Sequence, residues 1–221
     1  MALPRLLNSE QLVAVLRKEG IRDERVLLAI SRVRREQFVP DALKPWAYDN
    51  IALPIGEGQT ISQPFVVAAM IEALHLQGTE HVLEIGTGSG YGAAILAEVA
   101  GDVVTVEVRG QLARAAAERL RDCYSDRVTV AVGDGSLGWP ICAPYEAIVI
   151  TASTPTVPRP ILDQLTARGR LVAPIGSLKD QHLIVVERTD TRLRTRDLGP
   201  VRFVPLIGEG GFQILDPARR N

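Results

Sequence analysis

The sequence predicts an α/β fold of the Rossmann-like, doubly wound type, with a mostly parallel sheet, an antiparallel C-terminal hairpin and an N-terminal helical extension. Three observations carry this prediction. Short apolar strands alternate with helices between residues 82 and 174, which is typical of βαβ units in a parallel sheet covered on both faces. The first of these strands leads directly into a glycine-rich turn and a helix. Two later strands, joined by a short polar turn, indicate an antiparallel hairpin.

Composition limits the class of protein. With 221 residues, 46% of them hydrophobic, the chain can bury a sizeable core. Its net charge of -1 comes from interspersed charges of both signs, unlike the concentrated basic surface of a nucleic-acid binder. No apolar run is long enough to span a bilayer, and the N-terminus lacks the layout of a secretory signal. We therefore expect a cytoplasmic monomer with neither nucleic acid nor membrane as partner.

The two cysteines, Cys123 and Cys142, lack metal-ligand spacing. We interpret them as reduced, mostly buried thiols. The three histidines form no cluster along the sequence, so we expect no metal site.

The N-terminal part predicts two helices, over residues 9–19 and 23–34, separated at Gly20. Asp23 is well placed near the start of the second helix. Residues 40–61 then carry three prolines and two glycines, which indicates a long irregular segment. Its large apolar side chains need burial and argue against disorder. We interpret this segment as an ordered lid or site-forming loop.

The segment leads into Thr60-Ile-Ser-Gln-Pro64, and Pro64 suits the first turn of a helix that continues to about Leu74. Ser62 therefore lies at or just before a helix N-terminus. It can cap that helix, a role worth about 1 kcal/mol. It can also present its hydroxyl beside unpaired N–H groups, which favour a carboxylate. The two roles are compatible.

The chain is organised around the segment Val82-Leu-Glu-Ile-Gly-Thr-Gly-Ser-Gly-Tyr91. It predicts a buried strand over residues 82–85, a turn with three alternating glycines, and an apolar helix over residues 91–99. Such glycines permit positive φ and let a ligand approach the main chain closely. The first N–H groups of the helix point at that ligand. We interpret the unit as the cradle of a nucleotide or nucleoside.

Two acidic residues distinguish between the ligands of such a cradle. A dinucleotide site has G-x-G-x-x-G, and here Tyr91 stands where the third glycine would be. Glu84, inside the strand, would repel a pyrophosphate but suits a cation. Glu107, at the tip of the strand over residues 103–108, is placed to bind a ribose diol. A ribose without phosphates beside a positive centre describes S-adenosylmethionine better than NAD, which disfavours an NAD oxidoreductase.

The alternation continues after this unit. Ligands of parallel sheets bind outside the carboxyl ends of the strands, where Asp134 and Thr151 are expected. Asp134, between two glycines, can cap the next segment or bind the adenine amino group. The further elements predicted are a helix over 111–121, strands over 127–132 and 146–151, a helix over 158–166, strands over 170–174, 182–188 and 193–198, and an apolar segment over 201–206 before a polar tail.

With these residues in view, the chain resembles the protein-L-isoaspartate O-methyltransferase family over nearly its whole length. The most specific stretch is Gly58-Gln-Thr-Ile-Ser-Gln-Pro64, and the glycine turn also fits. Further likeness lies in Arg35-Glu-Gln-Phe-Val-Pro40, Gly133-Asp-Gly135 and Phe203-Val-Pro-Leu206. The chain departs from the family at Ala167-Arg-Gly-Arg170, where Pro-Gly-Gly-Arg is usual, and at Gly92, where glutamine is common.

The resemblance implies a class I methyltransferase fold in a single domain. Residues 1–78 would form N-terminal helices and the active-site loop, 79–176 the cofactor-binding core, and 177–221 the C-terminal strands. It implies methylation of the α-carboxylate of L-isoaspartyl residues in damaged proteins and peptides, which starts repair to L-aspartyl. S-adenosyl-L-methionine would be the methyl donor and S-adenosyl-L-homocysteine the product.

The same resemblance implies roles for particular residues. Ser62 would hydrogen-bond the substrate carboxylate, with Thr60, Ile61, Gln63 and Val204 around the substrate. The residues expected to hold the cofactor are Glu84, Ile85, Gly86, Thr87, Gly88, Ser89, Gly90, Glu107, Val108, Asp134, Gly135 and Thr151.

Two other functions stay open at this point. Some relatives methylate one defined Asp of a peptide natural product to form an aspartimide. A protein that binds the cofactor or damaged protein without turnover is the other alternative. The lack of a general base does not argue against catalysis, because a substrate carboxyl with a pKa of about 3.5–4 is already ionised at pH 7.

Overall fold

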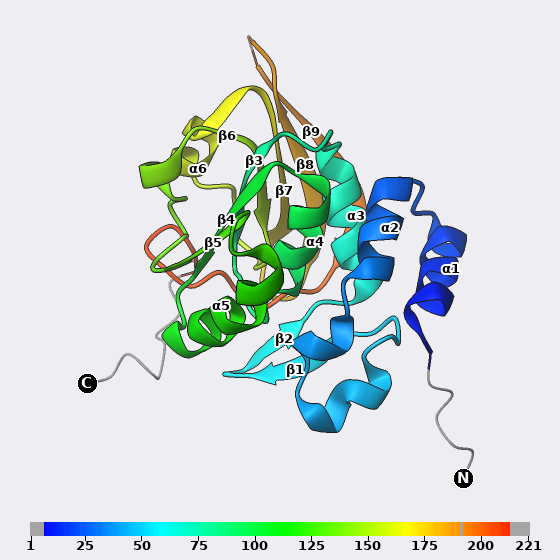
Figure 1. Ribbon diagram of the computed structural model, residues 1–221. Coiled ribbons are helices and arrows are strands. Elements are labelled where there is room, and N and C mark those ends of the chain that lie inside the picture. The colour runs from blue at the N-terminus through cyan, green and yellow to red at the C-terminus, as the bar shows by residue number, and fades with distance from the viewer. Residues whose placement is uncertain (1–6, 191, 213–221) are drawn as a thin grey trace.

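The computed structural model describes residues 7–190 and 192–212. Its centre is a seven-stranded sheet with the order β5-β4-β3-β6-β7-β8-β9 (Figure 1). The strands from β3 to β7 are parallel, and β8 and β9 are antiparallel. The predicted fold class is thereby confirmed. The strands are β3 His81–Ile85, β4 Asp102–Glu107, β5 Val128–Val132, β6 Tyr145–Ile150, β7 Leu165–Gly176, β8 Gln181–Arg188 and β9 Leu193–Val201.

The sheet extends in both directions from β3, through β4 and β5 on one side and β6 and β7 on the other. The order in which successive strands are added therefore reverses between β3 and β6, although the two strands run parallel. Their carboxyl ends flank a crevice of the kind that binds ligands in open α/β sheets.

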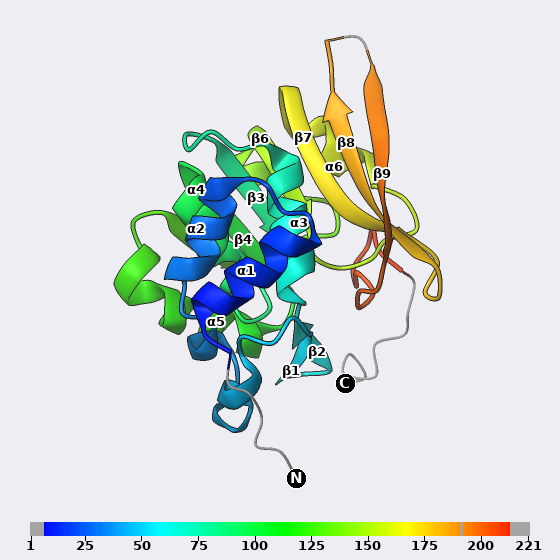
Figure 2. The same ribbon diagram turned by 90° about the vertical axis from the view of Figure 1, so that its right-hand side faces the viewer.

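Helices cover one face of this sheet much more fully than the other (Figure 2). Five of them contribute buried side chains to a core on that face, together with the apolar side chains of alternate strand residues, such as Val82 of β3 and Val149 of β6. Leu83 and Ile85 point into a second core on the opposite face, with Ile161 of a short helix. The helices are α1 Ser9–Glu19, α2 Glu24–Arg32, α3 Pro64–Leu74, α4 Tyr91–Val99, α5 Gly110–Tyr124 and α6 Arg159–Asp163.

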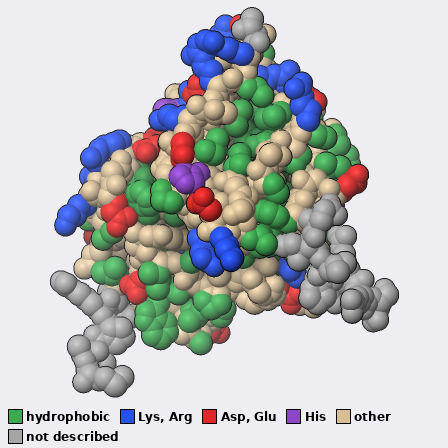
Figure 3. All heavy atoms as spheres, turned by 180° about the vertical axis from the view of Figure 1, so that it is seen from behind, with side chains coloured by type: hydrophobic (Ala, Val, Ile, Leu, Met, Phe, Trp, Pro, Cys, Tyr) green, Lys and Arg blue, Asp and Glu red, His purple; other side chains and the backbone are tan. Residues whose placement is uncertain are grey.

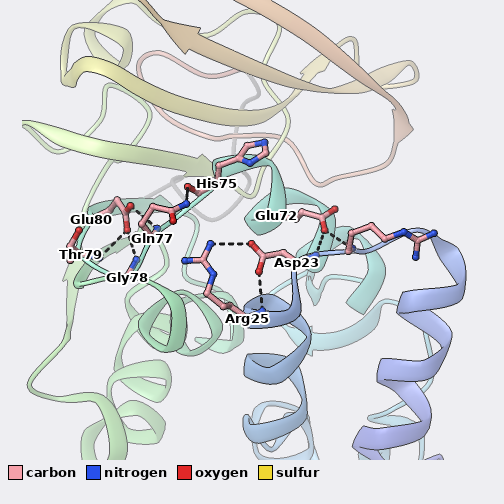
Figure 4. A network of polar contacts seen from close by, with 9 residues as sticks. Asp23, Arg25, Glu72, His75, Gln77, Gly78, Thr79 and Glu80 are labelled. Carbon is pink, nitrogen blue, oxygen red and sulfur yellow. Dashed lines mark hydrogen bonds and ion pairs between the residues drawn. The ribbon is translucent and has the colours of Figure 1, made fainter.

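The two N-terminal helices form as predicted, and their ends have clear physical causes. Gly20 ends α1 in the left-handed region with φ 117°, and the Asp23 side chain caps α2 by accepting from the Arg25 N–H. Glu72 of α3 accepts from the backbone N–H groups of Arg22 and Asp23 at 2.6 Å each, which joins α3 to the start of α2 (Figure 4).

A second carboxylate in the same view fixes the approach to β3. Glu80 accepts from the N–H groups of Gln77, Gly78 and Thr79 at 2.7–3.1 Å (Figure 4). The connection between α3 and the central strand is thus a closed turn.

The segment over residues 40–61 is ordered as predicted, but it is not irregular throughout. It contains the 3-10 helix η2 Asp41–Trp46 and a two-stranded antiparallel hairpin, β1 Leu53–Gly56 and β2 Gln59–Ile61. The 3-10 helix η1 Arg35–Phe38 precedes it. Leu53 and Ile61 pair with each other at the open end of the hairpin, and both are buried, which anchors the hairpin on the helical core.

The clearest difference from prediction concerns the helix expected over 158–166 and the strand expected over 170–174. The helix ends at Asp163, and β7 already begins at Leu165. Leu165 is buried and pairs with Tyr145, after which the register shifts before Arg170. Arg168 takes a positive φ of 73° within this irregular stretch. Arg168 and Gly169, at the point where the sequence departs from the family pattern, therefore lie inside a bulged strand.

The C-terminal part forms the predicted hairpin, with β9 continuing to Val201. The apolar segment over 201–206 adds no strand and makes a single bridge, between Pro205 and Ser153. Thr191 of the predicted turn and residues 213–221 of the polar tail lie outside the described residues.

The end of the β8–β9 hairpin projects from the molecule, and basic side chains gather there (Figure 3). Arg192, Arg194 and Arg196 are exposed, and none of them has an ion pair among the described residues. β9 is the edge strand of the sheet, and a row of like charges on an edge strand discourages pairing with other chains.

The prediction of buried cysteines was wrong for Cys123, which is exposed on α5, whereas Cys142 is half-buried. Both are free thiols. Cys123 falls on the outer face of an amphipathic helix, so its position follows the helix period and not its residue type. Among the described residues, no helix has the length and apolarity needed to cross a membrane.

Candidate active site

A large cavity lies at the carboxyl ends of β3, β4 and β6, with about 1030 Å³ of empty space including its open mouth. The β1–β2 hairpin, the glycine turn and residues 204–207 surround it. Gln63, Gly90 and Asp134 do not line it. The predicted site residues that do are Thr60, Ile61, Ser62, Glu84, Ile85, Gly86, Thr87, Gly88, Ser89, Glu107, Val108, Gly135, Thr151 and Val204.

The glycine turn has the backbone that its sequence predicts. Gly86, Gly88 and Gly90 have φ of 102°, 52° and 91°. A Cβ on Gly86 would lie 2.3 Å from Thr151 Oγ1, and that hydroxyl donates to the Gly86 carbonyl at 2.6 Å. Thr151 therefore fixes the turn from the end of β6. A side chain at position 86 would disrupt both the turn and the hydrogen bond from Thr151.

Glu107 ends β4 beside this turn. Its carboxylate accepts from the Gly88 N–H at 2.9 Å and from the Arg109 N–H at 3.0 Å, and the residue is only 7% exposed. These bonds hold the carboxylate at the cavity wall, where its remaining acceptor capacity suits a ribose diol.

Glu84 is a fully buried carboxyl group at the cavity wall. The Thr105 hydroxyl donates to it at 2.6 Å, and Thr105 in turn contacts Thr87 of the glycine turn. Burial raises the pKa of Glu84 to about 8, although the hydrogen bond from Thr105 opposes this shift. A cationic ligand in the cavity would favour the ionised form.

Gly92 accommodates this carboxyl group. A Cβ at position 92 would lie 2.2 Å from Glu84 Oε1, so the observed side-chain position requires glycine there. Glycine at position 92, where the family commonly has glutamine, is therefore matched to the conformation of the Glu84 side chain.

Ser62 lies at the opposite wall, between β2 and α3. Ser62 does not take the capping role considered for it: the N-cap position is Gln63, whose side chain makes no capping hydrogen bond, and the Phe65 N–H donates to Asn50 Oδ1 at 2.9 Å instead. The backbone turns one residue later than expected because Pro64 occupies the first helical position. The Ser62 side chain instead lines the cavity, and its carbonyl accepts from Arg35 Nη2 at 2.9 Å.

Residues 203–211 form the third wall and are fixed by buried polar side chains. The Gln181 side chain accepts from the Phe203 N–H at 2.7 Å and donates to the Phe203 carbonyl at 3.2 Å. The Leu206 N–H donates to the Ser153 carbonyl at 2.7 Å. Val204 therefore reaches the cavity on a rigid support.

Asp134 supports the far end of the same wall. One carboxylate oxygen accepts from the Ser136 N–H, and the other accepts from the Glu209 N–H, both at 2.9 Å. Gly135, and not Asp134, lines the cavity. The local bond to Ser136 agrees with the capping role considered for Asp134, and the bond to Glu209 adds a long-range contact that the sequence did not indicate.

Sequence reasoning missed part of the lining. The apolar inner wall comes from α3, α4 and β6, where periodicity predicts only core. Arg109 is near Glu107 in sequence, so its place at the strand end could have been inferred. The unpredicted lining residues are Gln59, Val67, Met70, Ile71, Tyr91, Gly92, Leu96, Val106, Arg109, Val149, Ala152, Pro205, Leu206 and Ile207.

The residues present fit S-adenosylmethionine. The cavity combines a glycine cradle, a diol-binding acid and a buried carboxyl group suited to a cation, and the described residues contain no cluster of metal-ligating side chains. The sheet order and this site define a class I, S-adenosylmethionine-dependent methyltransferase.

Comparison with known proteins specifies the family. Residues 7–211 match the family model described as protein-L-isoaspartate(D-aspartate) O-methyltransferase. A protein-L-isoaspartate O-methyltransferase of Alkalilimnicola ehrlichii is 53% identical over 201 residues, 90% of this chain and 91% of the relative. One from Methanoculleus marisnigri is 50% identical over 198 residues, 90% of each chain. The chain belongs to the protein-L-isoaspartate O-methyltransferase family.

Solved structures agree with this assignment. A protein-L-isoaspartate O-methyltransferase that is 29% identical superposes with a TM-score of 0.81, over 91% of this chain and 66% of that chain. A Plasmodium falciparum structure described with S-adenosyl-L-homocysteine is 22% identical, with a TM-score of 0.73 over 91% of this chain and 99% of that chain. The latter supports the fold.

Proposed function

We propose that this protein transfers the methyl group of S-adenosyl-L-methionine to the α-carboxylate of L-isoaspartyl residues in damaged proteins and peptides. Family membership, with relatives about half identical over nine tenths of the chain, carries this proposal. The cavity supports it, because Ser62 of the family's most specific segment and the glycine turn line the same space.

The chemistry requires little from acid–base residues. The substrate carboxylate has an ordinary pKa of about 3.5–4 and is the nucleophile at neutral pH. When bound, the cofactor supplies an electrophilic methyl group on a sulfonium. One carboxylate oxygen bonds to that methyl carbon while the carbon–sulfur bond breaks, which gives a neutral ester and a thioether. No proton is transferred.

The residues of this chain would bind, align and exclude water. The Ser62 hydroxyl would donate to the substrate carboxylate, with Thr60, Ile61, Gln63 and Val204 shaping the substrate side. The other predicted residues would hold the cofactor against the glycine turn, and Glu84 would face its cationic part. Alignment of this kind can supply about 7–11 kcal/mol.

The deciding experiment compares two peptides that differ only in Asp versus L-isoAsp, incubated with methyl-labelled cofactor. We expect base-labile label and released methanol from the isoaspartyl peptide alone. Equal labelling of both peptides, or labelling of neither, would contradict the proposal. Intact cofactor affinity without turnover would favour a binding protein instead.

We also propose that the enzyme works as a cytoplasmic monomer without nucleic acid or membrane. The cavity is closed by residues of one chain, the net charge is -1, and both cysteines are free. Sedimentation at micromolar concentration tests the monomer: a stable dimer would contradict it.

A further inference from the structure

Arg35 is a charged side chain with no exposed surface. Its residue is 0% exposed in η1, although arginine is rarely buried completely unless an acid pairs with it. No carboxylate among the described residues interacts with it; the groups that influence its guanidinium are Tyr91 and Tyr48. Its Nε and Nη1 have no hydrogen-bond partner within the described chain. Burying such a charge is unfavourable for folding, so its retention calls for a role.

Its contacts join both sides of the cavity. Nη2 donates to the Ser62 carbonyl at 2.9 Å and to the Ile51 carbonyl at 3.3 Å, which ties the ends of the hairpin segment together. The guanidinium also stacks over the Tyr91 ring, 4.8 Å from its centroid. Tyr91 is the first residue of α4, directly after the glycine turn, and both Ser62 and Tyr91 line the cavity.

The contacts of Arg35 suit a residue that positions its neighbours, and not only one that stabilises the fold. One nitrogen, Nη2, donates to both carbonyls while the planar face of the guanidinium rests on the Tyr91 ring, and the ammonium group of lysine has no such face. Phe38 of the same 3-10 helix packs edge-on against Tyr91, with ring centroids 5.6 Å apart. The distance between the Ser62 backbone and the start of α4 is therefore set through one side chain.

We propose that Arg35 is a positioning residue: it holds Ser62 in register with the cofactor turn and supplies an uncompensated buried positive charge that favours an anionic substrate. This inference rests on the proposed function, in which Ser62 binds a carboxylate. The walls of the cavity are protein of lower dielectric constant than water, so the attraction between that charge and a substrate carboxylate is stronger than in solution. Arg35 itself touches neither the substrate nor the cofactor.

The test uses the full chain with Arg35→Lys and Arg35→Met, and Arg34→Lys as matched control. Arg34 is the exposed neighbour, paired with Glu36 at 2.9 Å. For each variant, kcat and KM are measured with the isoaspartyl peptide, S-adenosyl-L-homocysteine affinity by calorimetry, and the melting temperature by circular dichroism.

We expect Arg35→Lys to raise the peptide KM about threefold or more, and Arg35→Met about tenfold or more, because each loses hydrogen bonds from a charged donor. S-adenosyl-L-homocysteine affinity should stay within about threefold in both. A smaller rise of the peptide KM in Arg35→Lys than in Arg35→Met would come from the charge of lysine. The rise that remains in Arg35→Lys would come from the missing planar guanidinium. Arg34→Lys should match the unaltered protein.

A purely structural role gives a different pattern. Cofactor affinity and melting temperature would then fall together while the peptide KM stays constant, and this result would overturn the proposal. If Arg35→Met does not fold, Arg35→Lys alone decides, since an unchanged KM in that variant also overturns it. Failure of the proposed function is separate, because the unaltered protein would then not methylate the isoaspartyl peptide at all.

Discussion

Ser62 and Glu84 occupy opposite walls of one cavity and carry different chemistry. The Ser62 hydroxyl is a donor whose side chain makes no cap, so it is available to a ligand. Glu84 is an acceptor held by Thr105 and removed from water. An anionic substrate and a cationic cofactor each find a complementary group, and neither group needs a partner acid or base.

Replacement of Ser62 by alanine tests the donor. In Ser62→Ala, kcat/KM for an isoaspartyl peptide should fall about 10–100-fold, the loss expected for one hydrogen bond to a charged group. S-adenosyl-L-homocysteine affinity should change less than about twofold. Initial rates and calorimetry measure the two effects. A variant with unaltered rates would remove Ser62 from the site.

Glu84 should make cofactor affinity depend on pH. Because burial raises its pKa to about 8, the carboxyl group holds a proton at pH 7 when no cofactor is bound. A cationic cofactor favours the carboxylate, so binding should release a proton and strengthen as pH rises toward 8, by up to about tenfold per pH unit. Titration calorimetry in buffers of different ionisation enthalpy measures the released proton.

Glu84→Gln is the control for this pH effect. The variant should bind more weakly and lose the proton release. The sign for stability is opposite: a carboxyl pKa raised above its unfolded value means that the folded state loses stability as pH rises from about 4.5 to 8. Chemical denaturation across that range should show this decline only in the unaltered protein. Release of a proton by Glu84→Gln would contradict the assignment.

At the scale of elements, the C-terminal wall depends on tight packing around Gly208. Its φ is 150°, and a Cβ there would lie 2.0 Å from Asp134 Oδ1 and 2.4 Å from Ser136 Oγ. Gly208→Ala should break the bond from Glu209 to Asp134, destabilise the fold by about 1–3 kcal/mol, and raise the peptide KM.

Gly78→Ala is a matched control, because Gly78 also has positive φ, 104°, but open space around it. It should cost stability through backbone strain without affecting the peptide KM. Peptide kinetics and urea denaturation measure both variants. Equal kinetic effects of the two substitutions would show that the wall does not depend on this packing.

The elements themselves differ in how far the sequence predicts them. Strong periodicity and end signals, as at Gly20 and Asp23, predicted α1 and α2 almost to the residue. The prediction began β7 at residue 170 because the bulge around Arg168 and Gly169 breaks the regular strand, and only the pairing of Leu165 with Tyr145 extends β7 to its observed start. The β1–β2 hairpin was missed for a similar reason, since its short strands are stabilised by burial and not by local propensity.

At the scale of the whole molecule, the meeting of the glycine turn and Glu107 in one cavity was predictable, and the connections between the cavity walls were not. The glycine turn and Glu107 are contiguous motifs whose geometry follows from local backbone chemistry. Arg35 stands in a run of charges that looks like a solvated surface, yet it is buried 27 positions from its partner Ser62. Long-range contacts of this kind have no local sequence signal.

Because one cavity joins residues from 59 to 207, a ligand in it should stabilise the protein as a unit. At 100 times its dissociation constant, S-adenosyl-L-homocysteine should add about 2.7 kcal/mol to the free energy of unfolding. Hydrogen exchange should slow in the hairpin, the glycine turn and residues 203–207 together. Protection confined to the glycine turn would contradict a jointly built site.

The charged edge strand has a consequence for an enzyme whose proposed clients are aged proteins. Such proteins expose backbone groups that can pair with the open edge of a sheet. An uncharged β9 would be more prone to pair with them and aggregate. Arg192, Arg194 and Arg196 repel a second copy of β9 and keep the open edge hydrated. We therefore expect this edge to disfavour the addition of a strand from another chain.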